Sequence, residues 1–268
     1  MQYDPIKRSL GKVFNANPWL RKLFYKLLDL LLLRAWHIKK QIRLWAKDYK
    51  ETASVLDAGS GFGQYSYFMA ANYPSWKIIS VDVKEEQIAD CNQFFNTIGL
   101  NNATFQIADL TTFVQPEQFD LVLSVDVMEH IAEDEKVFSN FHNSLKNGGM
   151  LLISTPSDQG GSDVHDDEHE SFVDEHVRDG YNIDDIKEKL LRAGFSKVEA
   201  KYTYGTPGNI SWKLSMKYPL LMLNFSKLLF IILPFYYLLT YPFCLLLNSM
   251  DLNMHQKRGT GLSVQAWK

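Results

Sequence analysis

The 268-residue sequence has few cysteines and no low-complexity segment. Its two cysteines, Cys91 and Cys244, are too few for a disulfide framework or a cysteine-based zinc site. The remaining composition, 46% hydrophobic and 22% charged, excludes a disordered or collagen-like chain. We therefore expect a globular protein of one or two structural units from a reducing compartment.

Acidic residues are scarce at the amino-terminal end. Residues 1–47 hold eleven lysines and arginines but two acidic residues, a formal charge of +9, and the remainder of the chain carries −12. Apolar residues recur at spacings of three and four from Trp19 to Trp45, which predicts one helix or two joined by a bend. We expect residues 1–48 to form a basic amphipathic arm that contacts an anionic lipid surface or nucleic acid. In the alternative, the apolar face packs on the protein's own core.

Charged residues are absent from Leu228 to Leu247, a stretch of 20 residues. That length would suffice for a membrane span. However, Pro234 and Pro242 argue against one unbroken helix. Residues 259–268 also show the apolar–polar alternation of a final sheet strand, and if that strand rejoins the domain, the chain cannot cross the membrane only once. We therefore expect residues 205–258 to form an apolar helical insertion that enters a membrane interface, covers a substrate cavity or forms a dimer surface.

Between these two segments, strand and helix patterns alternate, which is typical of a parallel sheet with crossover helices. We assign residues 49–204 and 259–268 to this domain. The expected strands are 54–58, 77–81, 103–107, 119–125, 150–155, 197–204 and 260–267. The expected helices are 62–72, 84–97, 131–146 and 183–193.

A glycine-rich turn follows the first expected strand. Gly59, Gly61 and Gly63 would let the backbone approach a ligand at the start of a helix, whose free amides favour an anionic or polar group. A dinucleotide-binding fingerprint would need glycine at position 64, where this sequence has Gln64. At the end of the next strand, Asp82 is positioned to accept two hydrogen bonds from a ribose diol.

These segments together resemble the class I S-adenosylmethionine-dependent methyltransferases, closest to the small-molecule and lipid group that includes quinone-biosynthesis enzymes. Five motifs carry the resemblance: VLDAGSGFG, IISVDV, QIADL, FDLVLSVDVMEHI and LKNGGMLLISTP. The resemblance implies an α/β, Rossmann-like seven-stranded sheet in the order 3-2-1-4-5-7-6, with the last strand antiparallel, and S-adenosylmethionine as cofactor.

The resemblance also implies roles for individual residues. The glycine turn would hold the methionine portion with Asp57 nearby, Asp82 the ribose, Val83 the adenine ring, and Ala108 with Asp109 the adenine amino group. The segment from Ser124 to His130 would line the cofactor and lead toward the substrate. The cofactor-binding residues so implied are Asp57, Gly59, Gly61, Gly63, Asp82, Val83, Ala108, Asp109 and Ser124.

Candidate catalytic residues follow the fifth strand. His176 and Arg178 resemble a His-x-Arg element of related methyltransferases, and either a general base or a substrate-orienting group would fit them. The alternative is that both brace the loop through carboxylate pairs. His130, a third candidate, is expected to line the pocket. The acidic loop containing His165 and His169 could ligate a divalent ion, but such loops are usually solvated, so no metal is expected.

We therefore expect a methyltransferase on the cytosolic side of a membrane that acts on an apolar or amphiphilic small molecule, such as a lipid, a quinone precursor or a polyene with an aromatic head. A nucleic-acid substrate is not expected, because the acidic loop would repel a polyanion and no base-flipping motif is present. Two alternatives remain: a nicotinamide-dependent oxidoreductase, which Gln64 disfavours, and a non-catalytic scaffold that binds S-adenosylmethionine at a membrane.

Overall fold

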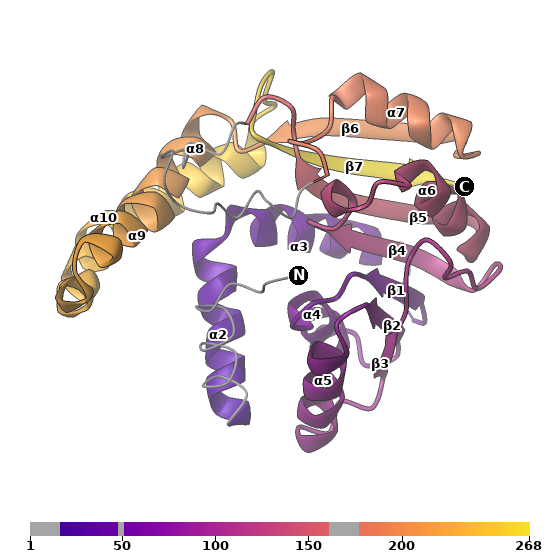
Figure 1. Ribbon diagram of the computed structural model, residues 1–268, viewed down its shortest axis with the longest axis horizontal. Coiled ribbons are helices and arrows are strands. Elements are labelled where there is room, and N and C mark those ends of the chain that lie inside the picture. Colours follow the sequence, from indigo (N-terminus) through magenta and orange to yellow (C-terminus); the bar gives the residue numbers. More distant parts are fainter. Residues whose placement is uncertain (1–16, 48–50, 161–176) are drawn as a thin grey trace.

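A seven-stranded sheet forms the centre of the molecule (Figure 1). The computed structural model describes residues 17–47, 51–160 and 177–268. The strands are β1 (Ser54–Ala58), β2 (Lys77–Asp82), β3 (Ala103–Ile107), β4 (Phe119–Val125), β5 (Leu145–Pro156), β6 (Lys197–Thr203) and β7 (Gly261–Trp267). Their order is β3-β2-β1-β4-β5-β7-β6, and β7 is antiparallel to both of its neighbours. The expected fold class and strand order are confirmed.

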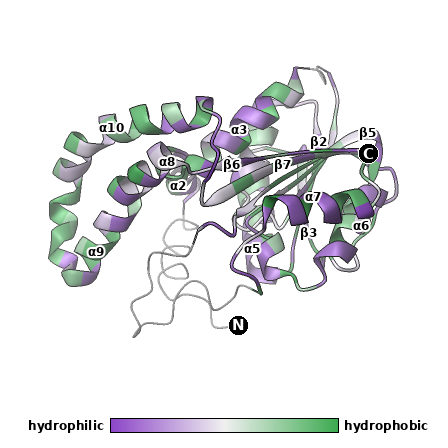
Figure 2. Cartoon of the chain, turned by 90° about the horizontal axis from the view of Figure 1, so that it is seen from above, coloured by the Kyte–Doolittle hydropathy of each residue, from purple (hydrophilic) through white to green (hydrophobic). Residues whose placement is uncertain are grey.

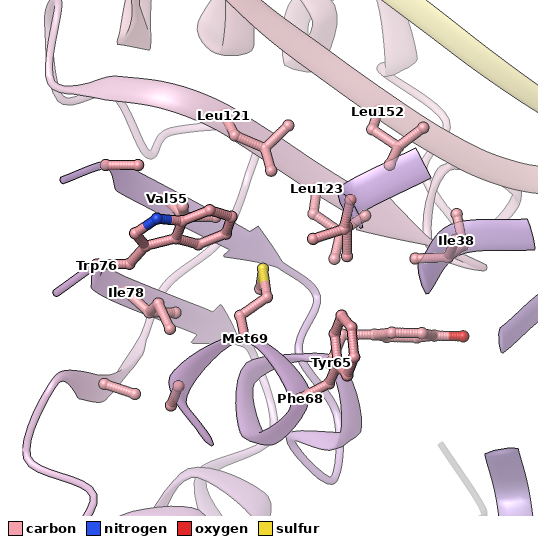
Figure 3. Packing of buried hydrophobic residues seen from close by; sticks show 14 of the residues in the cluster. Ile38, Val55, Tyr65, Phe68, Met69, Trp76, Ile78, Leu121, Leu123 and Leu152 are labelled. Atoms are coloured by element: carbon pink, nitrogen blue, oxygen red, sulfur yellow. The ribbon is translucent and has the colours of Figure 1, made fainter. Parts of the chain in front are cut away.

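Helices cover both faces of this sheet. The elements that follow the strands are α4 (Gln64–Asn72), α5 (Glu85–Thr97), the 3-10 turn η1 (Met128–His130), α6 (Asp134–Ser144) and α7 (Ile183–Arg192). On one face, Val55 and Leu121 pack with Met69 of α4 (Figure 3). On the other face, Leu56 packs in a cluster with Phe138 of α6. Because successive residues of β1 are buried on opposite faces, the sheet is covered on both sides, as parallel sheets require.

Among residues 17–47, two helices precede the sheet, α2 (Pro18–Leu31) and α3 (Leu33–Ala46), separated by Leu32 in an extended conformation. Helix α3 buries Ile38 and Ile42 in the core beside the sheet. Arg21 of α2 is 2% exposed and donates to the carbonyl oxygens of Asp90 and Phe62, both at 3.0 Å. This packing supports the alternative in which the apolar face of the arm lies against the protein's own core.

Residues 206–253 form a helical hairpin that projects away from the sheet (Figures 1 and 2). It consists of α8 (Thr206–Trp212), the π-helical turn η2 (Lys213–Lys217), α9 (Tyr218–Phe225), the 3-10 turn η3 (Lys227–Ile231) and α10 (Leu233–Asn253). Its two halves, residues 206–225 and α10, are joined by hydrogen bonds. The Tyr236 and Tyr237 hydroxyls donate to the carbonyl oxygens of Leu214 and Ser215, at 2.7 and 2.8 Å. Within the described residues, no helix has both the length and the apolar character needed to span a membrane.

The apolar stretch of residues 228–247 is not one unbroken helix, as expected, because the 3-10 turn η3 ends at Ile231 and α10 begins at Leu233. Helix α10 is continuous, with Pro234 in its first turn and Pro242 in its interior. A proline in the first turn removes no intrahelical hydrogen bond. Pro242 has no amide hydrogen to donate to the carbonyl of Leu238, yet α10 continues through it.

Asp251 fixes the base of the hairpin. Its side chain is fully buried, and it accepts hydrogen bonds from the amides of Tyr204 (3.2 Å), Gly205 (2.8 Å) and Gly208 (3.3 Å). One carboxylate oxygen also lies 2.9 Å from Nε2 of His37 in α3. One carboxylate thus joins α10, the turn that begins the hairpin, and α3.

Replacing this carboxylate should therefore destabilise the protein. We expect Asp251→Ala to lower the free energy of unfolding by about 3–5 kcal/mol, because His37 and three amides lose a buried acceptor. Urea unfolding followed by circular dichroism measures this change. The control is Asp184→Ala, whose side chain is 81% exposed, and which should change the free energy by less than about 1 kcal/mol. Equal effects of the two variants would contradict the role given to Asp251.

Candidate cofactor and catalytic site

The glycine turn between β1 and α4 is held close to two neighbouring elements. The amides of Gly59 and Ser60 donate to the carbonyl oxygen of Val81 at 2.8 and 2.9 Å. Gly59 has a φ of +79°, and a Cβ there would lie 2.2 Å from a methyl carbon of Val127, so only glycine fits. Around Gly61, in contrast, the nearest atom to such a Cβ is 3.9 Å away. The turn is therefore packed on one side and open above Gly61.

The ends of β2 and β3 bring the predicted ribose and adenine residues together. The two carboxylate oxygens of Asp82 accept from the amides of Gly61 (2.9 Å) and Lys84 (3.0 Å), and each retains capacity for a further hydrogen bond. Val83 is 57% exposed beside it. The amide of Ala108 donates to the Asp82 carbonyl at 3.1 Å, which places Ala108 and Asp109 at the same edge.

The two other carboxylates of this region differ in their surroundings. Asp109 is exposed, and hydrogen bonds from the amide and hydroxyl of Thr111 lower the pKa of its carboxyl group. Asp57 is 2% exposed and accepts from the hydroxyl of Ser66. Burial raises the pKa of Asp57 to about 6. A cationic ligand group near Asp57 would favour its ionised form.

The end of β4 and the turn after it supply a second set of polar groups. Ser124 is fully buried, and its hydroxyl has no hydrogen-bond partner among the described residues. Glu129 is 1% exposed and accepts from the Thr155 hydroxyl at 3.1 Å, and burial raises the pKa of its carboxyl group. His130 is exposed at the end of η1. These three residues form one border of the site.

Sequence reasoning missed a cluster of four residues, which we call the Arg34 cluster: Arg34, Tyr65, Asp126 and Tyr204. The Arg34 guanidinium pairs with the Asp126 carboxylate, and the Arg34 amide donates to the Tyr204 hydroxyl at 2.9 Å. The Tyr65 hydroxyl and Nε of Arg34 are buried without a hydrogen-bond partner among the described residues. Burial raises the pKa of both tyrosines to about 12, although Arg34 opposes the rise.

Sequence reasoning treated Arg34 only as one of the eleven lysines and arginines of residues 1–47. A weak signal for the cluster was available: Tyr65 lies two residues after Gly63 of the glycine turn, and Asp126 follows the fourth strand.

Arg178 lies in a bracing network. Its guanidinium donates to the Asp134 carboxylate at 2.7 Å and to the carbonyl oxygens of Met128 (3.1 Å) and Ile131 (2.9 Å). Lys189 also contacts Asp134, at 2.9 Å. The network supports the loop-bracing interpretation of Arg178.

The remaining loop candidates are not part of the described structure. His176, and the possible metal ligands His165 and His169, lie outside the described residues. Among the residues that are described, no group of three potential ligands could hold a metal ion.

The site fits S-adenosylmethionine in three respects. The backbone is open above Gly61, Asp82 retains acceptor capacity at the adjoining strand end, and the buried Ser124 hydroxyl lacks a partner within the described structure. A family model described as a methyltransferase domain matches residues 49–199. The chain belongs to the class I S-adenosylmethionine-dependent methyltransferases. The expected family is confirmed, and the hairpin lies beyond the matched segment.

Two curated relatives illustrate the range of the family. A phosphoethanolamine N-methyltransferase of Triticum aestivum is 30% identical over 156 residues, which cover 58% of this chain and 30% of the relative. Malonyl-[acyl-carrier protein] O-methyltransferase 2 of Ilyobacter polytropus is 23% identical over 62% of this chain and 66% of its own. The chain thus spans under a third of the length of the wheat relative.

Solved structures share the fold. Phosphoethanolamine N-methyltransferase 2 of Haemonchus contortus, in complex with phosphomonomethylethanolamine and S-adenosylhomocysteine, has a TM-score of 0.58 at 20% identity, covering 82% of this chain and 49% of its own. The [4+2]-cyclase SpnF has a TM-score of 0.57 at 16% identity, covering 85% and 80%.

The geometry at Asp82 gives a direct test of the cofactor site. We expect Asp82→Ala to weaken S-adenosylmethionine binding by about 1.5–3 kcal/mol, the range for a charge-assisted hydrogen bond, as measured by calorimetry. Asp82→Asn should lose less, because its amide oxygen still accepts one hydrogen bond. Glu199→Ala on β6, with a side chain 54% exposed, is the control and should bind normally. Unchanged affinity in both Asp82 variants would remove this residue from the site.

Proposed function

We propose that this methyltransferase acts on the polar head of an amphiphilic small molecule at a lipid surface. The hairpin of residues 206–253 carries the proposal, because many of its exposed residues are large and apolar. Figure 2 shows hydrophobic residues along much of α9 and α10. The large apolar residues of the hairpin that are at least 61% exposed are Phe225, Leu228, Phe230, Ile231, Phe235, Leu238, Leu239, Phe243 and Leu246. Soluble monomers rarely expose apolar patches of this kind unless they mark an interaction surface.

The charges of the hairpin favour a lipid surface as the partner. The sequence from Ile210 to Met250 contains no acidic residue, and its cations are Lys213, Lys217 and Lys227. Lys227 is exposed in η3, the turn between α9 and α10. A lysine can bury its methylenes while its ammonium group stays with lipid head groups, so this arrangement is suited to shallow interfacial insertion. Free thiols at Cys91 and Cys244 agree with a cytosolic location.

The position of the Arg34 cluster supports a polar acceptor group. Tyr204 of the cluster is followed directly by Gly205, the N-cap of the first helix of the hairpin. The cluster therefore lies at the point where the chain enters the hairpin. The wheat and Haemonchus contortus relatives are named for phosphoethanolamine, a polar acceptor. We therefore propose that the head of the acceptor enters beside the cluster while its apolar part stays with the hairpin and the lipid.

Methyl transfer is an in-line displacement, so the protein's main task is to hold the acceptor atom in position. When bound, the cofactor supplies the methyl group. A hydroxyl acceptor gains from a base during the reaction, and an amine must first lose a proton. We propose His130, at the exposed edge of the site, and His176 as the groups that accept this proton. The family match removes the nicotinamide-dependent oxidoreductase from consideration.

Substitution of the two histidines tests this assignment. We expect that one of the two variants, His130→Ala or His176→Ala, removes the base. That variant should lower turnover by roughly 10²–10⁴-fold and leave the affinity for S-adenosylmethionine unchanged. The assay follows S-adenosylhomocysteine formation on vesicles containing an amine-headed lipid or a phenol with an isoprenoid tail. Normal turnover in both variants would rule out a histidine base, and cofactor binding without turnover on either acceptor would favour a scaffold.

Flotation with phosphatidylcholine vesicles tests the lipid surface. We expect the triple variant Phe230→Ser, Phe235→Ser, Leu239→Ser to reduce vesicle binding at least about tenfold, because three apolar side chains no longer enter the interface. Leu191→Ser on α7, where leucine is 52% exposed, controls for loss of an exposed apolar residue elsewhere. If the intact protein remains in the aqueous fraction, the hairpin is a dimer surface or a substrate cover.

A further inference from the structure

A hollow of about 480 Å³ lies where α3 meets the end of α10. Most of its lining comes from one face of α3, and the rest from Asp29 of α2 and Leu252 of α10. The lining residues are Asp29, Ala35, Trp36, Lys39, Lys40, Arg43, Leu44, Lys47 and Leu252. None of them belongs to the glycine turn or to the strand ends of the cofactor site, so the hollow is separate from that site.

The lining of the hollow is strongly basic. It contains four cations and one carboxylate, a formal charge of +3. Their spacing along α3, at intervals of three and four residues, places the cations on one side of the helix. Burial lowers the pKa of Lys39, and the nearby charge of Arg43 adds to this effect, although Asp29 opposes it.

Two of these cations already have partners. Lys39 pairs with Asp29, and Lys40 donates to the carbonyl oxygen of Leu252 at 3.0 Å and to the side-chain oxygen of Asn253 at 2.9 Å. Arg43 and Lys47 are exposed and form no ion pair within the described part of the chain, and the Arg43 guanidinium lies 5.2 Å from the centre of the Phe68 ring. Arg43 and Lys47 are therefore available to an anionic ligand.

The hollow continues the apolar face of the hairpin. On α10, the exposed residues Phe235, Leu239, Phe243, Leu246 and Met250 follow one another at intervals of three or four, which aligns them along one side of the helix. The next position on that side is Asn253, to which Lys40 donates. A lipid layer in contact with this side of α10 would bring its head groups to the basic hollow.

We propose that this hollow binds the phosphate group of an anionic phospholipid in the layer that the hairpin contacts. The proposal rests on the proposed function, because it assumes that lipid surface. Arg43 can donate two parallel hydrogen bonds to phosphate oxygens, and Lys47 adds a second positive charge. Trp36 and Leu44 provide apolar surface beside these cations, as suits a boundary between head groups and acyl chains.

The test compares vesicles of phosphatidylcholine alone with vesicles that also contain phosphatidylglycerol. The wild-type chain should bind both, and the anionic vesicles at least about 25-fold more tightly, because each of the two exposed cations contributes about fivefold. In the double variant Arg43→Gln, Lys47→Gln, binding to phosphatidylcholine should be unchanged, whereas the gain from phosphatidylglycerol should fall by about fivefold for each charge removed. The matched control is Lys136→Gln, Lys197→Gln, which removes the same charge at side chains that are 52% and 64% exposed on α6 and β6. The control should keep the gain.

Each result separates this proposal from the proposed function. Three results would overturn the hollow as a lipid site and leave the hairpin's role intact. They are binding to phosphatidylcholine without a gain from phosphatidylglycerol, a gain that survives in the double variant, and an equal loss of the gain in the control variant. Wild-type binding to neither vesicle would overturn both. A final experiment titrates the protein with inorganic phosphate. If phosphate binds the wild type as tightly as the vesicles do, and binds the double variant weakly, the ligand is a free anion and the lipid assignment fails.

Discussion

The buried carboxylate of Asp251 is the interaction on which the arrangement of the other elements depends. A carboxyl group in the protein interior must be compensated by hydrogen-bond partners, and this one finds them in two separate parts of the chain, His37 of α3 and the amides of residues 204–208. Because His37 lies one turn after Arg34 in α3, the contact that fixes the hairpin also sets the start of α3, and with it the guanidinium that pairs with Asp126. The hairpin and the Arg34 cluster therefore share one structural element.

The glycine turn and the acidic strand ends could be predicted from the sequence, because they depend on short segments with strong local requirements. The sheet order followed from the resemblance of five motifs to a known family. The Arg34 cluster could not be predicted, since Arg34 and Asp126 are 92 residues apart. Composition likewise does not separate a solvated cation from a buried one. Arg21 was counted with the arm's surface charge, yet it is held by carbonyl oxygens of a distant loop and helix.

The two ends of the hairpin are adjacent where they join the methyltransferase domain. The hairpin leaves the sheet after β6 and returns just before β7, and an isolated bridge pairs Tyr202 with Gln256 beside this point. At the crossing the two chain segments are very close, since a Cβ on Gly259 would lie 2.2 Å from the carbonyl oxygen of Thr203. An insertion whose ends are adjacent adds a new surface without altering the register of the strands.

The same connection has a consequence for how the protein acquires its fold. β7 lies between β5 and β6 and pairs with both, but it follows the hairpin in the chain. During synthesis the apolar hairpin must therefore emerge from the ribosome before the strand that joins β6 to the sheet. Until β7 arrives, the edge of β5 is unpaired at the same time as the apolar surface is exposed, a combination that favours aggregation. Early contact of the hairpin with a lipid layer would protect the nascent chain during this interval.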